Sequence, residues 1–141
     1  DLYCGTGTIG IFLSQIATSV VGIEVVEDAV IAAKSNADIN NVENIKFICG
    51  RVEDYIDGFN NLDLIIVDPP RSGLDKKTID NVKRINPKEI IYVSCDPMTL
   101  VRDLKELEED YLIKEITPVD MFPNTHHVEC VSVLHRKSLE K

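Results

Sequence analysis

The sequence has 141 residues and 44% of them are hydrophobic, so residues 1–141 are expected to bury the core of a single domain. It contains no apolar run long enough to cross a bilayer and no basic, hydrophobic leader, so we expect a cytoplasmic monomer without membrane contact. The net charge of −9 argues against strong nucleic-acid binding by this chain alone, because such binding needs Lys and Arg to neutralise phosphates.

The cysteines lie far apart and form no C-x-x-C pair, which disfavours both a zinc site and a disulfide framework. They are Cys4, Cys49, Cys95 and Cys130. We expect reduced thiols and no bound metal. The adjacent His126 and His127 have no third ligand at a suitable spacing, so we expect them to pack in a loop or contact a partner.

Apolar, β-rich runs alternate with stretches of helical periodicity, the pattern of a parallel sheet covered by helices. Strands are expected at 1–3, 20–25, 45–49, 62–67 and 89–94, and helices at 8–18, 27–40, 75–85 and 97–109. Two further strands, near 111–119 and 128–136, should pair as an antiparallel hairpin. The pattern predicts an α/β, Rossmann-like fold whose first strand is truncated to a stub, so we expect the C-terminal part of a longer protein.

The segment Gly5-Thr6-Gly7-Thr8-Ile9-Gly10 matches G-x-G-x-x-G between the strand stub and a helix. This loop fits a nicotinamide or flavin dinucleotide as well as S-adenosylmethionine. Glu24 ends the next strand, where a carboxylate can accept hydrogen bonds from ribose hydroxyls. Asp1 favours S-adenosylmethionine, because a carboxylate beside the turn repels a pyrophosphate but can hold the ammonium group of a methionine moiety.

A rigid loop, Asp68-Pro69-Pro70-Arg71-Ser72-Gly73-Leu74, follows the strand at 62–67. Arg71 stands where nitrogen methyltransferases usually carry an aromatic residue, and the loop lacks the cysteine of RNA cytosine-5 methyltransferases. Both of those activities are therefore disfavoured. Arg71 is a solvated cation, a partner of Asp68 or Asp75, or a contact to a phosphate or base.

Cys95 follows the strand at 89–94 and precedes a helix that Asp96 should cap, with Pro97 in its first position. The positive end of the helix dipole favours the thiolate form of Cys95, and the charge of Asp96 opposes that effect. On position alone, a nucleophile and an ordinary buried cysteine remain open alternatives.

The chain resembles the RNA (uracil-5-)-methyltransferase family along essentially its whole length. The resemblance rests on Asp-Pro-Pro-Arg-Ser-Gly-Leu from residue 68, on Tyr-Val-Ser-Cys-Asp-Pro-Met-Thr-Leu-Val-Arg-Asp-Leu from residue 92, and on Asp-Met-Phe-Pro-Asn-Thr-His-His-Val-Glu from residue 120. It implies that Cys95 is the nucleophile and Glu129 the base. It also implies cofactor contacts at Tyr3, Thr8, Glu24 and Asp68, beside Gly5 and Gly7 of the loop, with the backbone near Arg51 a weaker candidate.

Thr8 departs from the Asn frequently found in the family, and Glu129 has the alternative role of an exposed strand charge. The implied reaction is methylation of carbon 5 of a uridine in ribosomal or transfer RNA, with S-adenosylmethionine as donor. Family members usually carry an N-terminal RNA-binding barrel, and some carry an iron–sulfur cluster bound upstream. Because its first strand is truncated and it has no basic platform, we expect residues 1–141 alone to be inactive or nearly so. The alternatives are a nucleotide-dependent oxidoreductase and a binding module without activity.

Overall fold

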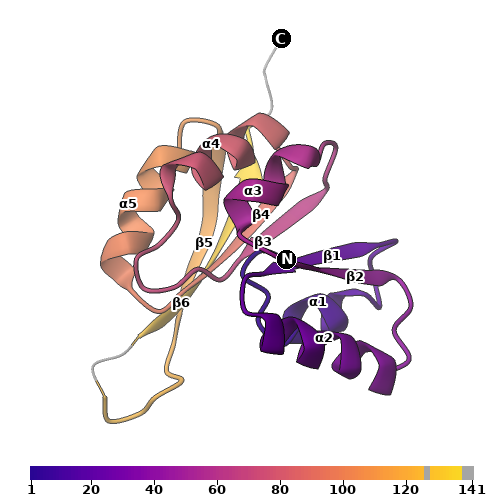
Figure 1. Ribbon diagram of the computed structural model, residues 1–141. Helices are drawn as coiled ribbons and strands as arrows, with labels where there is room; N and C mark the ends of the chain where they lie inside the picture. Colours follow the sequence, from indigo (N-terminus) through magenta and orange to yellow (C-terminus); the bar gives the residue numbers. More distant parts are fainter. Residues whose placement is uncertain (126–127, 138–141) are drawn as a thin grey trace. The chain divides into compact units, whose positions relative to one another are not determined.

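The computed structural model describes residues 1–125 and 128–137, and His126 and His127 lie outside them. The chain divides into two compact units, Asp1–Tyr55 and Ile56–Lys141, which are taken in turn (Figure 1). The single domain expected over residues 1–141 stays a prediction. No helix within the described residues has the length and apolarity to cross a membrane.

The first unit is built on a parallel pair of strands. Its elements are α1 (Thr8–Leu13), β1 (Val20–Glu24), α2 (Glu27–Ile39), β2 (Ile45–Cys49) and α3 (Val52–Tyr55), and β1 pairs with β2 from Val20↔Ile45 to Glu24↔Cys49. The strand expected at 1–3 is a single parallel bridge between Leu2 and Ile23. Helix α1 ends earlier than expected because the Ser14 hydroxyl donates to the carbonyl of Ile11 (2.6 Å), a local bond that competes with the helix. The short helix α3 was not expected.

The core of this unit forms where α2 packs on β2. Val30, Ala33 and Ala37 recur at helical spacing on α2 and are buried against Phe47 of β2. Gly7 lies against the same ring, since a Cβ atom built there would be 2.7 Å from Phe47. The glycine at this position therefore lets the turn before α1 pack directly on the core.

The second unit is a four-stranded sheet in the order β3-β4-β6-β5. Its elements are a 3-10 turn η1 (Ile56–Gly58), then β3 (Leu64–Val67), α4 (Lys76–Ile85), β4 (Glu89–Ser94), α5 (Pro97–Leu107), β5 (Tyr111–Val119) and β6 (Glu129–Arg136). Strands β3 and β4 are parallel, and β6 is antiparallel to both β4 and β5. The predicted terminal hairpin is confirmed. Figure 1 shows α4 and α5 side by side along this sheet.

The β4–β6 register is set by buried side chains. Ile90 lies opposite Leu134 and both are 0% exposed, while Ser94, in the last pair of the ladder, lies opposite Cys130 on the same buried face. Burial alternates along both strands. A slip of one residue would turn this apolar set away from the core, so the sequence allows only this register.

Two buried serines of this sheet differ in hydrogen bonding. The Ser132 hydroxyl on β6 has no partner among the described residues, whereas the Ser94 hydroxyl on β4 accepts from the backbone of Asp96 (3.1 Å) and donates to its carbonyl (3.0 Å). Ser132→Ala should leave the free energy of unfolding unchanged or raise it. Ser94→Ala should lower it by about 1–3 kcal/mol, because only this change leaves a buried donor, the amide of Asp96, without its hydrogen-bond partner. Urea denaturation measures both; a larger loss for Ser132→Ala would contradict the assignment.

Candidate functional site

The glycine turn of the first unit has a strained backbone. Tyr3 (φ 62°), Gly5 (φ 51°) and Gly7 (φ 80°) all adopt left-handed conformations, and Gly7 caps α1 while its amide donates to the carbonyl of Cys4 (2.8 Å). Thr8, the first residue of α1, is exposed. The predicted residues Tyr3, Gly5, Gly7 and Thr8 therefore lie in one continuous turn, and a non-glycine residue at positive φ often marks a functional constraint.

Two carboxylates bind the backbone amides of this turn. Glu24, at the end of β1, accepts from the amide of Gly5 (3.0 Å) through one oxygen and from that of Val26 (2.9 Å) through the other. Asp1 accepts from the amide of Gly10 (2.9 Å), and its second oxygen is buried without a partner among the described residues. The turn is therefore lined by negative charge and holds a buried acceptor that lacks a donor.

The two central glycines of the turn have different surroundings. A Cβ atom at Gly7 would meet Phe47, whereas a Cβ atom at Gly5 would meet nothing within 4 Å. The backbone at Gly5 is thus open and that at Gly7 is packed. A ligand can approach the turn closely only on the open side.

In the second unit, Cys95 follows β4 and lies in a tight turn. The hydrogen bonds of Ser94 to Asp96 span Cys95, and Asp96 then caps α5 by accepting from the amides of Met98 (2.9 Å) and Thr99 (3.4 Å). The predicted N-cap and Pro97 in the first helical turn are confirmed. Together with Arg71, these amides lower the pKa of Asp96, the amides contributing most. Cys95 itself is half-buried.

Glu129 is brought to the same end of the sheet by the β4–β6 register. The last ladder pair is Ser94↔Cys130, so continuing the register by one residue sets Cys95 opposite Glu129. Residues directly opposite on antiparallel strands have Cβ atoms about 4.5–5.5 Å apart on one face of the sheet. The register therefore places Cys95 and Glu129 at the same end of the β4–β6 pair.

Asp68, directly after β3, belongs to this second cluster. Loss of hydration and then the neighbouring charge of Glu129 raise the pKa of Asp68 above its ordinary value. The two carboxyl groups are therefore close enough to interact. Asp68 follows β3, Cys95 follows β4 and Glu129 begins β6, so the three residues lie at the same end of three neighbouring strands.

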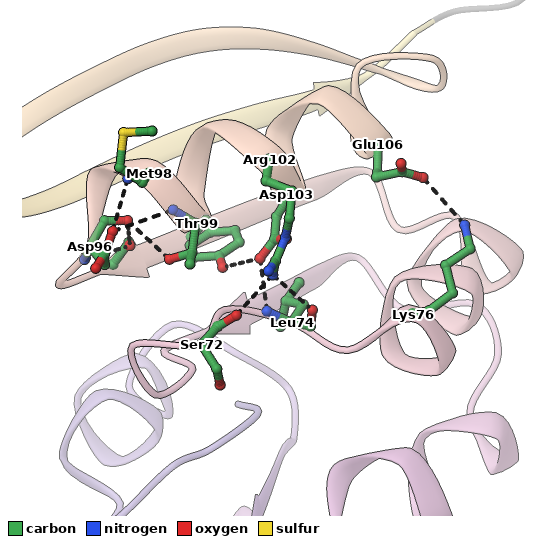
Figure 2. A network of polar contacts seen from close by, with 11 residues as sticks. Ser72, Leu74, Lys76, Asp96, Met98, Thr99, Arg102, Asp103 and Glu106 are labelled. Atoms are coloured by element: carbon green, nitrogen blue, oxygen red, sulfur yellow. Dashed lines mark hydrogen bonds and ion pairs between the residues drawn. The ribbon is translucent and has the colours of Figure 1, made fainter.

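The loop from Asp68 to Leu74 makes hydrogen bonds and an ion pair with residues of α5 and its cap. Sequence reasoning missed these contacts. Arg71 pairs with Asp96 (3.4 Å), not with Asp68 or Asp75 as the sequence suggested. Asp103 is fully buried and accepts from the amide of Leu74 (2.7 Å). The available signal was the position of Asp103 among the apolar residues on the buried face of α5. Figure 2 shows the contact between Asp103 and Leu74.

The described residues contain no group of three His, Cys, Asp or Glu side chains placed to hold a metal ion. The four cysteines are free thiols. Cys130 is buried and Cys49 exposed, while Cys4 is half-buried beside the glycine turn. Arg51, the weaker cofactor candidate, is exposed and pairs with Glu53.

Comparison with known proteins gives a family likeness along the chain. A profile of the family described as tRNA (Uracil-5-)-methyltransferase matches residues 1–137. A protein of Caldanaerobacter subterraneus subsp. tengcongensis named an uncharacterized RNA methyltransferase is 46% identical over 138 residues, which cover 96% of this chain and 31% of that protein. One of Clostridium tetani with the same name is 48% identical over 139 residues, which cover 95% and 30%. The chain thus spans about a third of the length of these relatives.

Solved structures agree on the fold. The Pyrococcus abyssi tRNA (uracil-54, C5)-methyltransferase in complex with S-adenosyl-L-homocysteine superposes with a TM-score of 0.83 at 41% identity, covering 95% of this chain and 33% of that one. A precorrin-6y C5,15-methyltransferase of Geobacter metallireducens superposes with a TM-score of 0.82 at 16% identity, covering 97% and 78%, a likeness in fold alone. The predicted Rossmann-like methyltransferase fold is confirmed.

The cysteines of the first unit should differ in reactivity. Burial raises the pKa of the Cys4 thiol to about 11, although the positive charge of the chain's first amino group lowers it; the charge of Glu24 makes a smaller raising contribution. At pH 8, iodoacetamide should therefore modify the exposed Cys49 well before Cys4, and modification of Cys4 should keep rising with pH up to about 11. Peptide mass spectrometry measures both sites, and the urea-unfolded protein is the control in which the difference should vanish. Equal rates in the folded protein would contradict the expectation.

Proposed function

Because the chain belongs to the tRNA (uracil-5-)-methyltransferase family, we propose that it is the catalytic part of an enzyme that transfers a methyl group from S-adenosylmethionine to carbon 5 of a uridine in RNA. The observation that carries the proposal is the register that sets Cys95 opposite Glu129, beside the carboxyl group of Asp68. A thiol and a carboxylate at one edge of a sheet are the two groups that this reaction requires.

The glycine turn fits the proposed cofactor. The buried, unpaired oxygen of Asp1 suits an ammonium donor, and Glu24 lies where ribose hydroxyls can be bound while it holds the amide of Gly5. Tyr3, Gly7 and Thr8 complete the proposed site, and family resemblance adds Asp68. When bound, S-adenosylmethionine supplies an electrophilic methyl group on its sulfonium. The amides of Gly5 and Gly10 already bind carboxylates, which disfavours a pyrophosphate and hence the oxidoreductase alternative.

The residues of the second cluster then have distinct roles. The Cys95 thiolate adds to carbon 6 of the uracil, forming a carbon–sulfur bond and making carbon 5 nucleophilic. After carbon 5 is methylated, Glu129 removes its proton, and the electrons of that carbon–hydrogen bond restore the ring double bond and expel the thiolate. The base must be presented outside its stack for the thiol to reach carbon 6.

The substrate and the wider protein follow from the same proposal. The Pyrococcus abyssi structure is of a tRNA enzyme, so transfer RNA is the first substrate to test and ribosomal RNA the second. The net charge of −9 leaves this chain poor in phosphate-binding cations, so RNA affinity must come mainly from residues beyond it in the intact protein. An upstream iron–sulfur cluster remains an implication of the resemblance only.

The nucleophile is tested with RNA containing 5-fluorouridine, whose carbon 5 carries no removable proton. The intact protein should form a covalent adduct that survives denaturing electrophoresis, Cys95→Ala should form none, and the exposed-cysteine control Cys49→Ala should form it normally. Methylation of uridine by Cys95→Ala would overturn the mechanism.

The base is tested by Glu129→Gln on ordinary uridine RNA. Turnover should fall by about 10²–10⁴-fold while a methylated covalent adduct accumulates, because addition proceeds and elimination lacks its base. Gel and mass analysis of the adduct distinguish this from general loss of activity. A variant that loses activity without accumulating adduct would place the base elsewhere.

The cofactor is tested by calorimetry of the intact protein. S-adenosylhomocysteine should bind and a nicotinamide dinucleotide should not, and Asp1→Asn should weaken S-adenosylhomocysteine by roughly tenfold or more, because a charge-assisted hydrogen bond is lost. Asp28→Asn, an exposed carboxylate in the first turn of α2, is the matched control. Binding of the dinucleotide alone would favour the oxidoreductase.

A further inference from the structure

A buried polar network joins α5 to the loop from Asp68 to Leu74. The carboxylate of Asp103 is 0% exposed. One of its oxygens accepts from the amide of Leu74 and from the hydroxyl of Tyr92, both at 2.7 Å, and the other accepts from Arg102 Nε (2.8 Å). A buried carboxylate is costly unless it is fully hydrogen-bonded, and this one has three donors.

Arg102 extends the network along the loop backbone. Its Nη2 donates to the carbonyls of Ser72 (2.9 Å) and Leu74 (3.2 Å), as Figure 2 shows. Gly73 between them has φ +73°, and a Cβ atom there would lie 2.5 Å from Asp103 and 2.6 Å from Arg102. The loop backbone therefore lies directly on these two side chains, and only glycine fits at position 73.

The network connects the segment that carries Cys95, the proposed nucleophile, with the segment that carries Asp68, a proposed cofactor contact. Tyr92 lies on β4 three residues before Cys95, and α5, which carries Asp103, begins two residues after it. Leu74 ends the loop that Asp68 begins. The Arg71–Asp96 ion pair forms a second, exposed tie between the same segments. The position of Asp68 relative to Cys95 thus depends on contacts that converge on one carboxylate.

We propose that Asp103 is a positioning residue, which through Leu74 and Tyr92 sets the loop of Asp68 against the turn of Cys95. The inference rests on the proposed function. Asp103 is fully buried and touches no substrate. It acts by holding two chain segments, 29 residues apart at Leu74 and Asp103, in one arrangement. Its removal should slow the chemical step more than it weakens substrate binding.

The test is Asp103→Asn in the intact protein, assayed at a temperature at which circular dichroism shows it folded. The single-turnover rate of uridine methylation at saturating RNA and S-adenosylmethionine should fall by about 10²-fold, because misplacing reacting groups by about 1 Å has that effect. The apparent KM values should change by less than about threefold, which separates positioning from lost binding. Formation of the 5-fluorouridine adduct should slow in parallel.

Two controls lie on the same helix. Glu106→Gln makes the same carboxylate-to-amide change in an exposed tie to Lys76 (3.3 Å) and should keep its rate within about twofold. Leu104→Val weakens buried packing beside Asp103 without touching the network, and it should keep its rate when folded. If both controls keep the parental single-turnover rate while Asp103→Asn lowers it, the lower rate is not caused by lost stability.

A folded Asp103→Asn with the parental rate would overturn the inference, and so would an equal fall for Glu106→Gln. Should Asp103→Asn fail to fold, Tyr92→Phe decides, because it removes a single donor: a slower chemical step supports the inference and an unchanged one overturns it. Methylation by Cys95→Ala would instead overturn the proposed function, so the two failures are distinguishable.

Discussion

The antiparallel pairing of β4 with β6 is the constraint on which the proposed site depends. Ile90 opposite Leu134 buries both side chains completely, and this apolar contact fixes the register for the whole ladder. Cys95 and Glu129 lie one position beyond its last pair, so the energy that aligns them comes from hydrophobic burial several residues away. Reactive groups at the end of a strand stay accessible, while the packing of the core fixes the distance between them.

Negative charge is used differently in the two units. At the glycine turn, Asp1 and Glu24 hold backbone amides, so they shape the turn while one acceptor stays unpaired. At the sheet edge, burial and then the neighbouring charge of Glu129 raise the pKa of Asp68. In both places the carboxylates suit a cationic donor and a proton transfer, and they suit a free polyphosphate poorly. Four of the 24 acidic residues of the chain thus lie where the proposed reaction has a use for them.

Sequence reasoning located nearly all elements because their signals are local. The cap at Asp96, the apolar run of β4 and the helical spacing on α2 each depend on neighbours within a few residues. It failed where a local competitor decided the outcome, as when Ser14 ended α1 early, and it missed the four-residue α3, too short to show periodicity. At the site, the glycine motif alone fitted two classes of ligand. The hydrogen bonds that Asp1 and Glu24 accept from this turn depend on the tertiary fold, and the motif itself does not predict them.

The partner of Arg71 and the role of Asp103 were beyond sequence reasoning for the same reason. Each depends on a contact between residues 25 or more positions apart, and many carboxylates compete for a given arginine until the fold selects one. An aspartate on the buried face of an amphipathic helix is nevertheless a readable anomaly, because burial of an unpaired carboxylate costs several kcal/mol. Such a carboxylate must accept hydrogen bonds, and backbone amides in a neighbouring irregular segment can donate them. Here that segment is the loop from Asp68 to Leu74, so the donors that the buried carboxylate requires also hold this loop in one defined position.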